Sequence, residues 1–89
     1  MKHPFSLEGK VALITGGGTG IGFDMAKCFV ESGAKVVITG RREEVLKEAI
    51  SELGDRAFYL VNDVSNTEQT AGLVKQIVEK FGRIDLVGE

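Results

Sequence analysis

The sequence predicts an α/β fold in which one parallel sheet carries helices on both faces. Three observations support this prediction. Short apolar, β-branched runs alternate with segments whose apolar residues recur at helical spacing. The connections between these segments are short, and a glycine run at Gly16–Gly22 joins the first apolar run to the first helical segment. Alternation of this kind is typical of βαβ units.

Four segments have the character of buried strands. We expect them at Lys10–Thr15, Lys35–Thr39, Arg56–Val61 and Ile84–Val87. Each is a short, nearly continuous apolar run, which is the pattern of a parallel strand covered on both faces.

Three helices are expected between these strands, each with a glycine at its end. The first begins near Ile21 and ends at Gly33, and the second covers 43–53 before Gly54. The third follows a capping box, in which Ser65 caps the helix and Glu68 reaches back, and Gly82 closes it. The positions expected to face the sheet are Ile21, Met25, Cys28, Phe29 and Ser32, then Val45, Leu46, Ala49, Ile50 and Leu53, then Leu73, Val74, Ile77, Val78 and Phe81.

Right-handed crossovers between successive strands place them in the order 3-2-1-4, which is the first half of a Rossmann-type doubly wound fold. In this arrangement the ligand crevice lies between the ends of the first and fourth strands. We interpret residues 1–9 as an N-terminal arm and residues 10–89 as one β-α-β-α-β-α-β unit. No repeat beyond the βα units and no low-complexity linker divides the chain.

The composition excludes several classes of protein. The chain has 89 residues and a formal net charge of −2, which gives no reason to expect nucleic acid as a partner. No segment is long and apolar enough for a membrane span, and the first residues lack a secretion signal. Cys28 is the single cysteine, so no internal disulfide and no thiolate metal site is expected, which is consistent with the cytoplasm. We interpret Cys28 as a buried structural thiol and His3 as an exposed bystander.

The glycine run has the properties of a phosphate-binding turn. It lies between a predicted strand and a predicted helix, where backbone amides and the positive end of the helix dipole face an anion. The first glycine permits the tight turn, the next lets backbone approach a pyrophosphate, and the last lets the helix pack on the strand. The residues predicted to bind a dinucleotide here are Gly16, Gly18, Thr19, Gly20, Ile21 and Gly22. An ordinary glycine turn is the alternative interpretation.

Thr15, Gly16, Gly20 and Gly22 form the pattern Thr-Gly-x-x-x-Gly-x-Gly, which resembles the cofactor motif of the short-chain dehydrogenase/reductase family. The lead-in Leu7–Ile14 is similar to that of the family as well, and the resemblance extends through essentially the whole chain. It implies a hydride-transferring oxidoreductase that uses a nicotinamide dinucleotide.

The end of the second predicted strand indicates which dinucleotide is preferred. Many such sites place a carboxylate there for the adenosine ribose, whereas this chain has Gly40 followed by Arg41 and Arg42. A carboxylate would repel a 2′-phosphate and a guanidinium grips it, so we expect NADP(H) rather than NAD(H). The resemblance gives Arg41 this role, with assistance from Arg42. Against this, NADP-binding relatives often have a basic residue where this chain has Thr19, and both arginines could simply be solvated.

The resemblance implies further roles and also shows what this sequence lacks. Asp63 and Val64 match the pair that contacts adenine in the family, and Asn62 could support the same loop, although aspartate before a helix is also a common turn residue. The Asn-Asn-Ala-Gly segment, the catalytic serine and the Tyr-x-x-x-Lys pair have no counterpart, since Asp63 rather than lysine stands four residues after Tyr59, the only tyrosine. We interpret Tyr59 as a packing residue.

Three functions therefore remain open. The first is the amino-terminal, NADP(H)-binding portion of an oxidoreductase that acts on a carbonyl or alcohol substrate in a longer chain. The second is a non-catalytic nucleotide-binding module. The third is a structural or dimerising domain with a vestigial site. In each case we expect no catalytic turnover by these 89 residues alone. We also expect self-association through the unpaired edge of the fourth strand.

Overall fold

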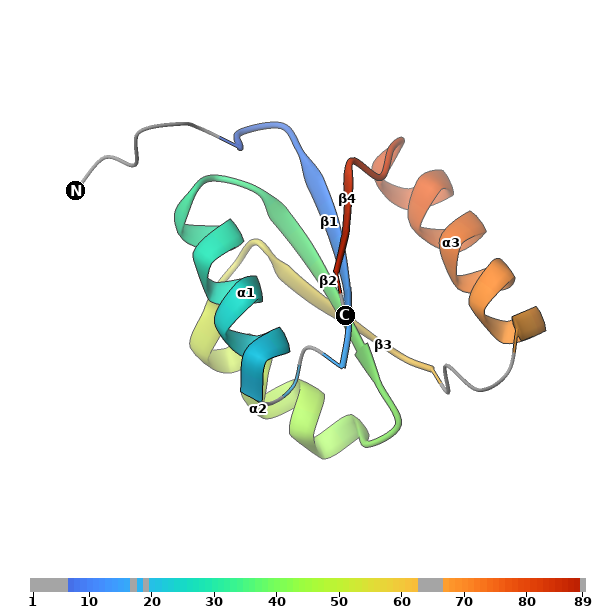
Figure 1. Cartoon of the computed structure of the whole chain (residues 1–89), viewed down its shortest axis with the longest axis horizontal. Coiled ribbons are helices and arrows are strands. Elements are labelled where there is room, and N and C mark those ends of the chain that lie inside the picture. The colour runs from blue at the N-terminus through green and yellow to red at the C-terminus, as the bar shows by residue number, and fades with distance from the viewer. Residues whose placement is uncertain (1–6, 17, 19, 63–66, 89) are drawn as a thin grey trace.

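The chain forms four strands and three helices in strict alternation (Figure 1). The computed structural model describes residues 7–16, 18, 20–62 and 67–88. The elements are β1 (Val11–Thr15), α1 (Gly20–Glu31), β2 (Lys35–Gly40), α2 (Glu43–Leu53), β3 (Ala57–Val61), α3 (Thr67–Phe81) and β4 (Leu86–Gly88). The predicted elements are all present, with boundaries that move by one or two residues. The predicted capping box falls mostly outside the described residues.

The sheet has the predicted topology. The strands pair in the order β3-β2-β1-β4, and every pairing is parallel. The register aligns Thr15 with Thr39, and Gly40 with Val61, so the carboxyl ends of three strands meet at one edge. This edge carries the glycine turn.

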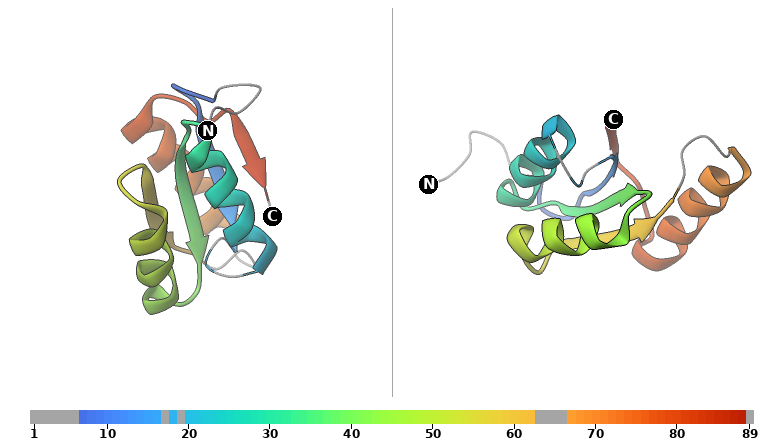
Figure 2. Two further views of the ribbon diagram at one scale, coloured as in Figure 1. Left: turned by 90° about the vertical axis from the view of Figure 1, so that its left-hand side faces the viewer. Right: turned by 90° about the horizontal axis from the view of Figure 1, so that it is seen from below.

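Alternating side chains build a separate apolar core on each face of the sheet. Ala12 and Ile14 of β1 face α1 and α2, whereas Val11 and Leu13 pack with Leu73 and Ile77 of α3. Figure 1 shows α1 and α2 on one side of the sheet and α3 on the other, and Figure 2 shows the same ribbon from two further directions. The near-continuous apolar strands are explained by this arrangement, because both faces of β1 and β2 are covered.

Helix α1 is rotated relative to the prediction. Its buried residues are Gly22, Ala26 and Val30, while Ile21 is 77% exposed and Cys28 is exposed. The prediction of Ile21 and Cys28 as sheet-facing residues was therefore wrong. Small residues at four-residue spacing let the helix approach the sheet closely, and the larger apolar residues then lie along its flanks.

The other two helices agree better with their predicted faces. Helix α2 buries Leu46, Ala49 and Leu53, as expected. Helix α3 buries Leu73 and Ile77, but Val74 and Val78 are exposed, so that part of its predicted face was wrong. One sheet layer covers only about a third of a helix circumference, and the two valines lie beyond it.

The last residues of the predicted arm pack against the domain. The Leu7 amide donates to the Ser32 carbonyl at 2.7 Å, and the Leu7 side chain packs on the core shared by α1 and α2. The Glu8 backbone lies so close to Gly33 that a Cβ there would meet the Glu8 amide nitrogen at 3.2 Å. His3 lies outside the described residues.

Candidate dinucleotide-binding site

Three strand ends are joined at the carboxyl edge of the sheet. The Gly16 amide donates to the Thr39 carbonyl, and the Asn62 amide donates to the Gly40 carbonyl, both at 2.8 Å. These bonds continue the sheet beyond β1 and β3 and place the starts of three loops side by side. Residues predicted separately from three regions of the sequence are thereby brought to one edge.

The turn after β1 uses glycine where other residues would be strained. Gly16 has a φ of 69° and Gly20 has a φ of 61°, both in the left-handed region. Open space surrounds the position that a Cβ would occupy at each residue, so the backbone here is accessible. Helix α1 begins at Gly20, the amides of its first turn have no acceptor within the helix, and Gly22 is buried. This geometry suits an anion.

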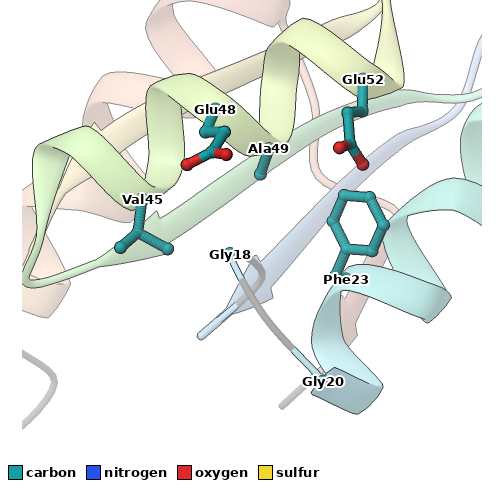
Figure 3. Close-up of a pocket in the computed structure, with 7 residues that line it drawn as sticks. All are labelled: Gly18, Gly20, Phe23, Val45, Glu48, Ala49 and Glu52. Atoms are coloured by element: carbon teal, nitrogen blue, oxygen red, sulfur yellow. The ribbon is translucent and has the colours of Figure 1, made fainter.

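Packing adds a constraint at Gly18 beside the dinucleotide-binding role that the sequence predicts. A Cβ built on Gly18 would lie 2.8 Å from Val45 Cγ1 of α2. Figure 3 shows Val45 directed toward the loop that contains Gly18. The glycine turn is therefore packed against α2, which fixes the distance between the turn and the loop after β2. Sequence reasoning missed Val45 because its spacing marked it only as a core position.

A hollow of about 300 Å³ lies between the glycine turn and the start of α2. Its walls are Gly16, Gly18, Thr39, Gly40, Arg41, Arg42, Val45 and Leu46. Both arginine side chains are exposed, and neither forms a hydrogen bond or ion pair with any residue that the structure describes. Arg42 is the N-cap of α2 but makes no capping bond through its side chain. Cations at a helix N-terminus oppose the helix dipole, so these arginines do not stabilise α2.

A second hollow on the other side of Gly18 has the opposite electrostatic character. It measures about 400 Å³ and is lined by Gly18, Gly20, Phe23, Val45, Glu48, Ala49 and Glu52 (Figure 3). The two carboxylates would repel a phosphate. Although it is the larger of the two, it is the less suitable for a dinucleotide.

Two buried polar side chains at the carboxyl edge have no hydrogen-bond partner among the described residues. Thr39 is 0% exposed, and its hydroxyl is unpaired. Asn62 is 2% exposed, and both polar atoms of its amide are unpaired. An unsatisfied buried polar atom costs about 1–3 kcal/mol, and such groups are tolerated where a ligand or further chain completes them. The predicted site residues Thr19, Asp63 and Val64 lie outside the described residues.

Tyr59 does more than pack. Its ring lies against the core of α1 and α2, and its hydroxyl donates to Glu43 Oε2 at 2.9 Å. This hydrogen bond is the main cause of the raised pKa of the Tyr59 phenol, with smaller contributions from burial and the Glu43 charge. The sequence gives little indication of this contact. A carboxylate such as Glu43 is common in the first turn of a helix, so its presence there does not point to a tyrosine partner.

Within the described part of the chain, no group of three or more metal-ligating side chains comes together. The same residues contain no helix with the length and apolar character to cross a membrane.

Comparison with known proteins identifies the family. A family model described as short chain dehydrogenase matches residues 10–88. The short chain dehydrogenase/reductase astE of Aspergillus oryzae is 40% identical over 89 residues, which cover 96% of this chain and 34% of that protein. Tropinone reductase-like 2 of Erythroxylum coca is 44% identical over 81 residues, which cover 91% of this chain and 30% of that protein.

Solved structures give the same result. The 3-ketoacyl-(acyl-carrier-protein) reductase of Brucella melitensis, solved with NADH, has a TM-score of 0.85 at 44% identity, covering 92% of this chain and 34% of that one. A short chain dehydrogenase of Bacillus anthracis has a TM-score of 0.88 at 43% identity, covering 94% and 35%. The chain thus spans about a third of the length of the relatives it matches. It carries a dinucleotide-binding fold and belongs to the short chain dehydrogenase family.

Proposed function

We propose that this chain binds NADP(H) in preference to NAD(H) and serves as the cofactor-binding portion of an oxidoreductase. The observation that carries this proposal is the hollow between the glycine turn and α2, where Arg41 and Arg42 are the charged side chains among the described lining residues. Neither guanidinium is engaged by another described residue, so both are available for a phosphate. Gly40 leaves no carboxylate at the strand end to oppose it.

The residues around the hollow are of the types that bind NADP(H). In this proposal the glycine turn and the first amides of α1 hold the pyrophosphate, and the guanidinium of Arg41 holds the 2′-phosphate with help from Arg42. Asp63 and Val64 are proposed to contact adenine, with Thr19 beside the pyrophosphate. When bound, the nicotinamide supplies hydride exchange with a carbonyl or alcohol carbon.

The comparisons support the binding of a nicotinamide dinucleotide, whereas the proposed preference for a 2′-phosphate rests on residues 40–42. One relative with 44% identity was solved with NADH, so the shared fold does not by itself select NADP. A charge-assisted contact contributes about 1.5–3 kcal/mol, which corresponds to a preference of about ten- to a hundredfold.

Titration calorimetry with NADPH and NADH tests the proposal. We expect the purified chain to bind NADPH about ten- to a hundredfold more tightly, and Arg41→Ala to remove most of that difference. Lys47→Ala is the matched control, because it removes one positive charge from an exposed position of α2 away from the hollow. Equal affinities for the two dinucleotides in the unmodified chain would contradict the proposal.

A further inference from the structure

We propose that Tyr59 is a positioning residue for 2′-phosphate selection: its hydroxyl holds the Glu43 carboxylate away from Arg41 and Arg42. The inference rests on the proposed function. It concerns a carboxylate that stands, in sequence, directly beside the two guanidiniums to which the phosphate is assigned.

Glu43 is the first residue of α2 and follows Arg42 without a gap. A free carboxylate at this position can interfere in two ways. It can pair with a neighbouring guanidinium, and its charge repels a dianionic phosphate in the same hollow. In the part of the chain that the structure describes, Glu43 forms no ion pair with either arginine. Its Oε2 atom instead accepts a hydrogen bond from the Tyr59 hydroxyl at 2.9 Å.

The fold gives Tyr59 a fixed position from which to hold this carboxylate. Alternation along β3 places Ala57 and Tyr59 on the α1 and α2 side of the sheet, where the Tyr59 ring packs against the core. The hydroxyl is thus carried by a strand, whereas Glu43 and the arginines belong to the β2–α2 connection and the start of α2. A rigid aromatic side chain anchored on the neighbouring strand restricts a flexible one.

The protonation state of Tyr59 is suited to this role. Its hydrogen bond to Glu43 keeps the pKa of the phenol above the ordinary value of 10.0. The phenol therefore remains protonated, and can donate this hydrogen bond, throughout the neutral range.

The Tyr59→Phe variant removes the hydroxyl and retains the ring. Freed from its partner, Glu43 competes for the guanidiniums with the energy of a solvent-exposed ion pair. We expect the preference for 2′,5′-ADP over 5′-AMP, which lacks only the 2′-phosphate, to fall by about two- to fivefold, with unchanged affinity for 5′-AMP. The double variant Tyr59→Phe/Glu43→Gln has no carboxylate to release and should recover the preference. A purely structural role for Tyr59 would alter both affinities together and would not be rescued.

The Glu43→Asp variant provides an independent route if Tyr59→Phe does not fold. Its carboxylate is one methylene shorter, loses the hydroxyl contact and stays beside the arginines, so the preference should again fall. Glu43→Gln is its uncharged control and should retain the preference.

Calorimetry on the unmodified chain and these variants separates the two claims. If the unmodified chain does not discriminate between 2′,5′-ADP and 5′-AMP, the proposed function is overturned and this inference falls with it. If it discriminates and both Tyr59→Phe and Glu43→Asp keep its ratio, or if the double variant fails to recover it, the inference alone is overturned.

Discussion

The two edges of the sheet differ in the pairing of their charged side chains: Arg83 and Asp85 at the amino edge are paired, whereas Arg41 and Arg42 at the carboxyl edge have no partner among the described residues. At the amino edge, Asp85 Oδ2 accepts the Val11 amide at 2.8 Å, and Asp85 Oδ1 forms an ion pair with Arg83 at 2.7 Å. The Lys35 amide donates to the Lys10 carbonyl, and the Asp85 amide donates to the Val11 carbonyl. These contacts connect β1 to β2 and to the segment that leads into β4.

At the carboxyl edge four side chains around the hollow and the strand ends are unpaired within the described part of the chain. The guanidiniums of Arg41 and Arg42, the Thr39 hydroxyl and the Asn62 amide have no partner among the described residues. Two backbone hydrogen bonds nevertheless extend the sheet at this edge, donated by the Gly16 and Asn62 amides. Backbone bonds thus connect the strands at both edges, and the edges differ in the pairing of these side chains. Paired groups stabilise the fold, whereas unpaired groups around a hollow are available for a ligand.

Among these variants, Gly16→Val should have the largest effect on ligand binding at the carboxyl edge. A β-branched residue at a φ of 69° is strained by about 1–3 kcal/mol and distorts the turn assigned to the pyrophosphate. Calorimetry with NADPH should show at least about a tenfold loss of affinity. Gly9→Val is the matched control, since Gly9 has a φ of 80° and open surroundings away from the hollow. If Gly9→Val weakens binding as much, the contrast between the edges is wrong.

A methyl group at Gly18 should have a smaller effect through packing. In Gly18→Ala the new Cβ would lie 2.8 Å from Val45 Cγ1, so the Val45 side chain, the turn or α2 must shift. We expect a loss of unfolding free energy of about 1–3 kcal/mol by urea denaturation, together with weaker NADPH binding. Adding Val45→Ala makes room for the methyl group and should restore the binding in part. No recovery would show that Gly18 acts through the ligand alone.

Asp85→Asn should affect stability at the amino edge and leave binding unchanged. The hydrogen bonds from Arg83 and then from the Val11 amide hold the pKa of Asp85 below its ordinary value of 3.8. Between the folded and unfolded pKa values of Asp85 the unfolded chain binds more protons. The contribution of Asp85 to the free energy of unfolding is therefore fully present above the unfolded pKa and is lost as the pH falls through the folded pKa. The urea midpoint of Asp85→Asn should be lower at neutral pH and should lack this acid-dependent part. A changed NADPH affinity at neutral pH would contradict the separation of the edges.

Much of the fold follows from the sequence because strand and helix periods differ. The alternation of apolar runs with helical segments predicts the element order, and right-handed crossovers then leave the strand order β3-β2-β1-β4. The exposure of Ile21 and Cys28 could not be foreseen in the same way. Periodicity shows that a helix has an apolar face, but the distance of that helix from the sheet decides which residues occupy its centre. Gly22 and Ala26 make this distance short.

The site divides along a similar line. Arg41 and Arg42 were predicted as part of it, because their position directly after a predicted strand can be recognised from the neighbouring sequence alone. The contacts of Val45 with the turn and of Tyr59 with Glu43 join segments distant in the sequence, and no spacing rule relates them. Sequence reasoning therefore identified the groups proposed to touch the ligand and missed those that position them.

An amide chemical-shift titration with 2′,5′-ADP tests the difference between the two edges most directly. We predict that the amides of Gly16, Gly40, Arg41 and Arg42 shift on binding, while those of Val11, Lys35 and Asp85 at the amino edge do not. Shifts centred on the amino edge, or on Glu48 and Glu52 beside the acidic hollow, would contradict the account.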